Sequence, residues 1–187
     1  MTDHDRLVAI LAERSARLGE FTLASGARSA LYIDARMTAM SPDGLALIGP
    51  LGLATIEDAG WRADSVGGLT LGADPVSYAI AYASALAGSV GTPIRAFTVR
   101  KEAKAHGTGK LIEGPFRKGD RVVVIEDVIT TGGSALKAVD AVKSAGASVV
   151  GVLSLVDREE GGRERIEGEG YPVRTLVSAS EIVSRMQ

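Results

Sequence analysis

The chain has 187 residues, of which 45% are hydrophobic and 24% are charged, a composition typical of one globular domain with a sizeable core. Its net charge of −2 excludes a general attraction to nucleic acid or anionic membranes, and the lack of cysteine excludes disulfides and thiolate chemistry. With no pattern typical of a secretory signal or a membrane span, we expect a single soluble domain over residues 1–187, located in the cytoplasm.

Hydrophobic periodicity predicts the elements in chain order. An apolar stripe in DRLVAILAERSARLGE predicts a first helix that ends near Gly19. The next expected elements are a strand, turn and strand over 20–36, a helix over 41–60, a strand over 64–69, a helix over 74–88 and a strand over 93–99. A strand over 121–127, a helix over 132–147, a strand over 148–158 and a last strand and helix over 171–183 complete the chain.

Strands thus alternate with helices over most of the sequence. Because parallel neighbours need helical crossovers, this order predicts an α/β fold with a mostly parallel central sheet flanked by helices. In such sheets ligands bind beyond the carboxyl ends of the strands, so the residues that follow each strand are the first candidates for a site.

The stretch VVVIEDVITTGGSA, residues 122–135, places two acids and a loop of small residues at the end of a buried strand. Gly132 and Gly133 allow the backbone to approach an anion, and the loop leads into the N-terminus of a helix. Hydroxyl donors in the same loop are Thr130, Thr131 and Ser134. The pattern predicts a phosphate-binding loop.

No Gly-Lys-Ser/Thr motif is present, so the loop is not a Walker loop. Since carboxylates repel phosphate, Glu126 and Asp127 are expected to bind sugar hydroxyls or a divalent cation, and the ligand should be a sugar phosphate. The alternative is that the two acids only end a strand and cap a helix.

The stretch resembles the phosphoribosyl-pyrophosphate (PRPP) motif of type I phosphoribosyltransferases. In that family the acid pair binds the ribose 2- and 3-hydroxyls and the loop holds the 5-phosphate. The resemblance assigns PRPP binding to Glu126, Asp127, Val128, Ile129, Thr130, Thr131, Gly132, Gly133 and Ser134.

Residues 100–119 carry a charge of +4 while the rest of the chain carries −6. Their glycines and Pro115 favour a long, mobile loop, which is suited to a lid over a polyanion; the alternative is an ordinary solvated charge run. Within it, RKEAKAHG resembles the catalytic loop of orotate phosphoribosyltransferases. This resemblance assigns pyrophosphate contacts to Arg100, Lys101, Lys104 and His106, and catalytic roles to Lys101, Lys104 and His106 together with Asp127.

Other stretches resemble the same family. FTLASGARSALYIDAR is similar to its N-terminal base-pocket segment, with Ala24 where many members have lysine, and VGGLTLGADPVSYAIA is similar to its second glycine turn. LSLVDREEGG is similar to the strand end whose arginine holds the orotate carboxylate, which assigns orotate binding to Arg158 and Thr130. A surface salt bridge with Asp157 or Glu159 is the alternative for Arg158. The family fold implies a small N-terminal hood, about residues 1–40 plus part of the C-terminal segment.

The resemblance implies an enzyme that transfers phosphoribosyl from PRPP to N1 of orotate, giving orotidine 5'-monophosphate and pyrophosphate in de novo UMP biosynthesis. It also implies Mg2+ held mainly through PRPP and water, and a homodimer whose lid loop is shared across subunits, with no nucleic-acid or membrane partner. Alternatives are a PRPP-binding regulator on the same fold and a transferase for purines or another pyrimidine. A nucleic-acid binder is disfavoured because Phe116 is the only aromatic residue in the basic segment.

Overall fold

The computed structural model describes residues 1–22, 28–88, 92–102 and 111–186. The first half contains α1 (Asp3–Ile10), the π-helical turn η1 (Leu11–Ser15), β1 (Ala16–Thr22), β2 (Arg28–Ile33), α2 (Arg36–Ala39), α3 (Pro42–Asp58), β3 (Ser65–Leu69) and α4 (Ala73–Leu86). The second half contains β4 (Arg95–Val99), β5 (Ile112–Glu113), β6 (Arg121–Ile129), α5 (Gly133–Ser144), β7 (Ser148–Asp157), α6 (Gly162–Gly168), β8 (Val173–Ser178) and α7 (Ala179–Met186).

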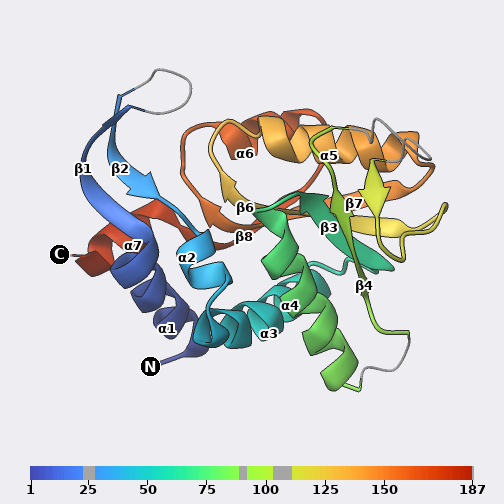
Figure 1. The fold of residues 1–187 in the computed structure, drawn as a ribbon, viewed down its shortest axis with the longest axis horizontal. Coiled ribbons are helices and arrows are strands. Elements are labelled where there is room, and N and C mark those ends of the chain that lie inside the picture. Colours follow the sequence, from blue (N-terminus) through green and yellow to red (C-terminus); the bar gives the residue numbers. More distant parts are fainter. Residues whose placement is uncertain (23–27, 89–91, 103–110, 187) are drawn as a thin grey trace.

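A six-stranded sheet with the order β5-β4-β3-β6-β7-β8 forms the centre of the molecule (Figure 1). The pairs β4/β3, β3/β6, β6/β7 and β7/β8 are parallel, and only the short β5 is antiparallel, to β4. The predicted α/β fold with a mostly parallel sheet is confirmed. Because β6 lies between β3 and β7, the residues that follow it are in the middle of the sheet's carboxyl edge.

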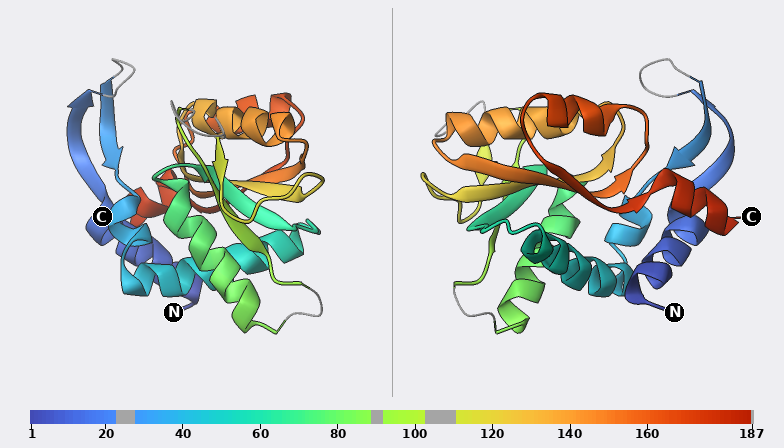
Figure 2. Two further views of the ribbon diagram at one scale, coloured as in Figure 1. Left: turned by 45° about the vertical axis from the view of Figure 1, so that its right-hand side comes forward. Right: turned by 180° about the vertical axis from the view of Figure 1, so that it is seen from behind.

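The sheet is covered on both faces because its central strands are apolar on both sides. Along β6, Val123 and Ile125 pack in the cluster that includes α3 and α4, whereas Val122 and Val124 pack in the cluster that includes α5. This period-two alternation divides the core into two layers, which the views of Figure 2 show as helices on either side of the sheet.

The N-terminal segment packs beside the sheet as α1, η1 and the antiparallel hairpin of β1 and β2. The prediction of one helix ending near Gly19 is wrong at its end: the helical run of α1 and η1 ends at Ser15, and the chain is extended from Ala16, which pairs with Ile33. Contacts between α1 and α7 bring the two ends of the chain together, and His4 Nε2 lies 3.1 Å from Leu176 O.

Three short elements were not predicted: α2, β5 and α6. The basic segment, expected to lack regular structure, contains β5, in which Ile112 pairs with Val99. The helix α6 follows β7 and buries Ile166 against the loop before α5. None of the helices within the described ranges combines the length and the apolar composition that a membrane span requires.

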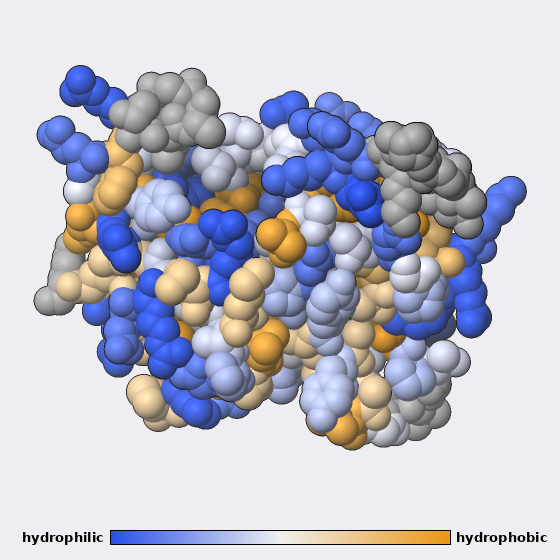
Figure 3. Space-filling model, in the orientation of Figure 1, coloured by the Kyte–Doolittle hydropathy of each residue, from blue (hydrophilic) through white to orange (hydrophobic). Residues whose placement is uncertain are grey.

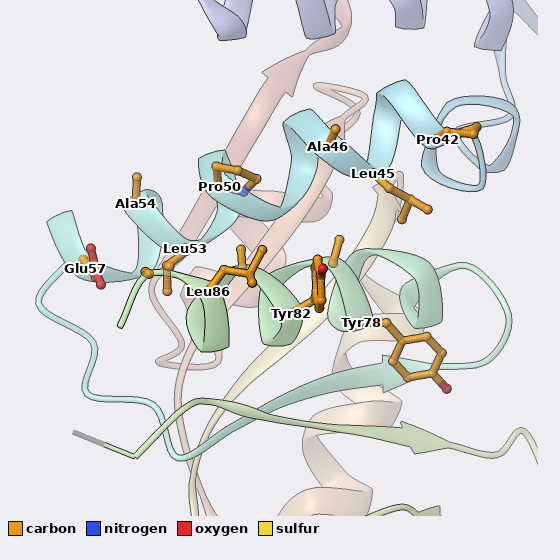
Figure 4. Close-up of a pocket in the computed structure, with 13 residues that line it drawn as sticks. Pro42, Leu45, Ala46, Pro50, Leu53, Ala54, Glu57, Tyr78, Tyr82 and Leu86 are labelled. Atoms are coloured by element: carbon orange, nitrogen blue, oxygen red, sulfur yellow. The ribbon is translucent and has the colours of Figure 1, made fainter. Parts of the chain in front are cut away.

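Over α2, α3 and α4, apolar residues reach the surface among hydrophilic ones (Figure 3). Between α3 and α4 lies a groove of about 810 Å³ with mainly apolar walls. Tyr78, Tyr82 and Leu86 follow one side of α4 opposite the leucines of α3, as Figure 4 shows, and all three are more than half exposed.

Candidate active site

The acid pair is near the carboxyl end of β6, in the centre of the sheet. Glu126 is buried, and its Oε2 is a buried oxygen that accepts no hydrogen bond from the described residues. Desolvation by burial raises the pKa of this carboxyl well above its usual value, and the neighbouring Asp127 raises it further. A ligand that brings hydroxyl donors would supply the missing hydrogen bonds and stabilise the carboxylate.

The strand continues through Val128 and Ile129, and only then does the chain turn into the predicted loop. Gly132 has the left-handed backbone φ of 74°, and a side chain there would meet the carbonyl oxygen of Gly162. The helix α5 begins at Gly133, so its free N–H groups face the loop. A small cavity of about 70 Å³ is lined by the loop residues from Thr130 to Ser134.

A second turn approaches the acid pair from β3. After Leu69 the chain passes through Thr70, Leu71 and Gly72 into α4, and Gly72 lies directly against the Asp127 carboxylate. Asp74, in the first turn of α4, holds this turn because its Oδ2 accepts a hydrogen bond of 2.6 Å from Thr70 Oγ1.

Asp74 also binds the neighbouring strand. Its Oδ1 accepts a hydrogen bond of 2.8 Å from Thr98 Oγ1 on β4, and the Tyr78 hydroxyl lies 2.9 Å from the same Thr98 oxygen. Because Thr98 precedes Arg100 and Lys101 by two and three residues, Asp74 connects the glycine turn to the base of the basic segment.

These turns surround one open cavity of about 530 Å³. Its walls are Tyr32, Ile33, Asp34, Ala35, Arg36, Leu69, Thr70, Leu71, Gly72, Lys101, Glu126, Asp127, Val128, Thr130, Thr131, Ser134 and Arg158. The cavity therefore brings together the acid pair, hydroxyls of the loop, one lysine of the basic segment and the arginine after β7. Ile129, Gly132 and Gly133 line the adjoining small cavity instead.

Arg158 is almost completely buried directly after β7. Its backbone N–H donates to Ile129 O over 2.9 Å, which fixes it beside the end of β6. Its Nη2 donates to Glu160 Oε1 over 2.6 Å and to Ser29 Oγ over 2.9 Å. The salt bridge predicted as the alternative for this residue therefore exists, but its partner is Glu160 rather than Asp157 or Glu159.

The basic segment is described only in part. Lys101 lines the cavity. Arg100 is not among the residues that line it, and its Nη1 lies 3.5 Å from Glu113 Oε1 on β5. Lys104, His106 and Ala24 lie outside the described residues, so the predictions for them remain predictions.

The sequence prediction did not include Asp34 and Arg36 among the site residues. They follow β2 and form a charge pair in which Arg36 Nε donates to Asp34 Oδ1 over 2.8 Å, at the wall of the cavity. The signal was present in LYIDAR, where charged residues directly follow a strand, but no periodicity indicated that this hairpin folds over the sheet edge.

Comparison with known proteins finds relatives in the family that the sequence motifs resemble. The family described as "Phosphoribosyl transferase domain" matches residues 75–177, just over half of the chain. The orotate phosphoribosyltransferase of Aquifex aeolicus is 44% identical over 186 residues, covering 98% of this chain and 99% of the relative. That of Rhodopseudomonas palustris strain TIE-1 is 46% identical over 183 residues, covering 96% and 95%.

Solved structures of orotate phosphoribosyltransferases are similar to this chain over nearly its full length. The crystal structure of Mycobacterium tuberculosis H37Rv orotate phosphoribosyltransferase in complex with PRPP has a TM-score of 0.79 and 40% identity, covering 97% of this chain and 99% of that chain. The Aeropyrum pernix orotate phosphoribosyltransferase has a TM-score of 0.79 and 32% identity, covering 96% and 97%.

The sheet order, the acid pair at the end of β6 and the loop before α5 define a phosphoribosyltransferase, as the domain match shows. Since relatives above 40% identity span nearly the entire chain, the particular group is also settled. The chain belongs to the orotate phosphoribosyltransferase family.

Proposed function

We propose that this chain transfers the phosphoribosyl group of PRPP to N1 of orotate, giving orotidine 5'-monophosphate and pyrophosphate in de novo UMP biosynthesis. The observation that carries the proposal is that Asp127, Thr130 and the buried Arg158 line one cavity of about 530 Å³. A sugar phosphate and a carboxylate-bearing base need these groups side by side.

For PRPP, the Glu126 and Asp127 carboxylates accept hydrogen bonds from the ribose 2- and 3-hydroxyls. The loop from Val128 to Ser134 holds the 5-phosphate through backbone N–H groups, hydroxyls and the N-terminus of α5. Support comes from the small cavity beside the acid pair and from hydroxyls of Thr130, Thr131 and Ser134 that make no hydrogen bond with the described residues.

For the departing pyrophosphate, the cations of Arg100, Lys101, Lys104 and His106 neutralise the charge that develops as the C1–O bond breaks. Asp127 holds the ribose so that C1 lies between the base and the leaving group. Lys101 already lines the cavity, which supports this assignment.

For orotate, the guanidinium of Arg158 pairs with the base carboxylate, and Thr130 contacts the ring. Arginine suits the task because its planar fork binds a carboxylate bidentately. A transferase for bases without a carboxylate has no need of a buried arginine at this position.

Magnesium fits the site as an ion bound by the substrate rather than by a cage of protein side chains. Within the described ranges no group of three or more histidine or carboxylate side chains could surround a metal ion. Because Mg2+ typically binds substrate phosphates and keeps several waters, it would be held mainly by PRPP and water. When bound, the ion supplies neutralisation of pyrophosphate charge.

The protein is proposed to act as a homodimer with the lid loop of one subunit over the site of the other. The apolar groove between α3 and α4 is the surface that a second copy would cover, since exposed apolar patches of this kind mark interfaces. Tyr78 links the groove to Thr98, just before the basic segment. A monomer in light scattering at micromolar concentration would exclude the shared lid.

Two further proposals concern the whole chain. Residues 1–187 form a single domain with a hood of about residues 1–40 plus part of the C-terminal segment, supported by the packing of α1 against α7. The location is cytoplasmic, supported by the absence of cysteine.

The direct test mixes the protein with PRPP, Mg2+ and orotate and follows the loss of orotate absorbance. Hypoxanthine, uracil and a sample without metal are the controls. Metal-dependent consumption of orotate alone is expected. Tight PRPP binding without turnover of any base would instead indicate a sensor, and turnover of hypoxanthine or uracil would indicate a different base specificity.

A further inference from the structure

Arg158 is already occupied by a carboxylate from the same chain. Glu160 follows it by two residues, and its Oε1 accepts a hydrogen bond of 2.6 Å from Arg158 Nη2. The two partners are unequally exposed, because the Arg158 side chain is 5% accessible while that of Glu160 is 37% accessible. The arginine is thus fixed in the site, and the glutamate reaches it from the surface.

The Nε donor of the guanidinium is nevertheless unfilled. Arg158 Nε is a buried nitrogen that donates to no acceptor within the described residues. A buried N–H without an acceptor is costly, and native structures retain few of them. A carboxylate that binds arginine from the side takes Nε together with Nη2, and here Nη2 is held by Glu160 and Ser29.

An entering carboxylate that binds Nε and Nη2 together therefore finds Nε free and Nη2 already donating to Glu160. It can complete the fork only by replacing an existing acceptor of Nη2. Of the two acceptors, Ser29 belongs to β2 and its Oγ also donates to Leu31 O, so it is tied to the hairpin. Glu160 lies on an exposed turn and can move into water at little cost.

We propose that Glu160 is a specificity-determining residue that acts as an internal competitor: it neutralises Arg158 in the empty site and is displaced by the carboxylate of the substrate. The inference rests on the proposed function, because it takes the orotate carboxylate as the incoming anion. It adds that orotate binds by replacing the Glu160 carboxylate at Arg158, so its affinity depends on the cost of breaking the Arg158–Glu160 pair.

The exchange has a consequence for selectivity. A pyrimidine that lacks a carboxylate leaves the Arg158–Glu160 pair intact, whereas orotate or its nucleotide must break it. Removing the negative charge of Glu160 therefore strengthens ligands that carry the carboxylate and leaves the others unchanged.

The test compares the wild type with Glu160→Gln by calorimetric titration of orotidine 5'-monophosphate and of uridine 5'-monophosphate, which differ only in the carboxylate. The variant is expected to bind the first about 3–10-fold more tightly, as for loss of a partly exposed ion pair. Its affinity for the second and its KM for PRPP should stay within twofold. Glu164→Gln, the same charge change on an exposed position of α6, should alter none of these values.

Equal or weaker binding of orotidine 5'-monophosphate by Glu160→Gln would overturn the inference, because Glu160 would then support the bound state. Equal strengthening of both nucleotides would also overturn it, since the effect would be general repulsion of anions. A wild type that neither binds orotidine 5'-monophosphate nor consumes orotate would overturn the proposed function itself.

Discussion

The carboxylate of Asp127 lies directly against the backbone of Gly72, with no room between them for a side chain. The two residues come from adjacent parallel strands: Asp127 is on β6, and Gly72 ends the turn that follows β3. A methyl group at position 72 would overlap all three atoms of the carboxyl group. The glycine turn therefore fixes the position of the acid that is proposed to hold the ribose.

Gly72→Ala should displace the Asp127 carboxylate and weaken PRPP binding by at least about tenfold, equivalent to about 1.4 kcal/mol. Thermal stability should change little, because a carboxylate at the cavity wall can rotate into solvent. Titration calorimetry with PRPP measures the first quantity and thermal unfolding the second. Gly168→Ala is the matched control, since a methyl group there meets no atom within 4 Å. Unchanged PRPP affinity in Gly72→Ala would contradict the proposed role of Asp127.

Glu126→Gln should raise the stability of the folded protein at higher pH and lower its affinity for PRPP. The raised pKa of Glu126 means that the folded protein binds its proton more tightly than the unfolded chain does. Its contribution to stability is therefore fully present below the unfolded value of about 4.5 and is lost as pH rises through the folded value. Glutamine has no charge to desolvate, so the variant should gain stability relative to the wild type as pH rises.

Urea unfolding of both proteins at pH 5 and pH 8 measures this difference, which should be larger at pH 8. PRPP affinity of Glu126→Gln should fall, because the amide offers one acceptor oxygen in place of two. A variant that is less stable than the wild type at pH 8 would show that Glu126 is ionised and well solvated in the free protein.

Lys101→Ala should lower kcat strongly, by about 100-fold, with a smaller effect on the KM for PRPP, because its charge is needed most when pyrophosphate departs. Lys118→Ala is the control, since Lys118 belongs to the same basic segment but lines a different cavity beside α5. Steady-state rates at saturating substrates measure the effect. Equal losses in both variants would indicate general attraction of PRPP rather than a specific role.

The sequence was sufficient for the centre of the site. Apolar β6, the acid pair and Gly132 are contiguous in the chain, and their chemistry is local, so the strand, loop and helix were predicted nearly to the residue. The strand differed in that Val128 and Ile129 continue to pair with β7, and the helix differed in that α5 ends at Ser144, three residues before the predicted end at 147.

The remainder depends on pairing between distant segments. Ile112 is extended because the edge of β4 offers it a partner, which the surrounding glycines and Pro115 did not indicate. Ser29 meets Arg158 across 129 residues of sequence, so the contact of the hairpin with this arginine could not be read from the chain.

At the opposite end of the sheet, Asp120 should be important for stability alone. It is buried and accepts hydrogen bonds of 3.1 Å from Ser65 Oγ, 3.0 Å from Arg117 N and 2.7 Å from Arg95 Nη2. These contacts join the amino ends of β3, β4 and β6. Asp120→Ala removes the partner of a mostly buried Arg95, which typically costs about 3–5 kcal/mol.

Chemical denaturation should show this loss, while kcat at a temperature below unfolding should be unchanged because the site is at the carboxyl ends of the same strands. Glu167→Ala, which removes one partner of the exposed Arg163–Glu167 pair on α6, should have a much smaller effect. If Asp120→Ala were instead as stable as the wild type but slower, the amino ends of the strands would have to influence the site through the sheet, and the separation of stability from catalysis would fail.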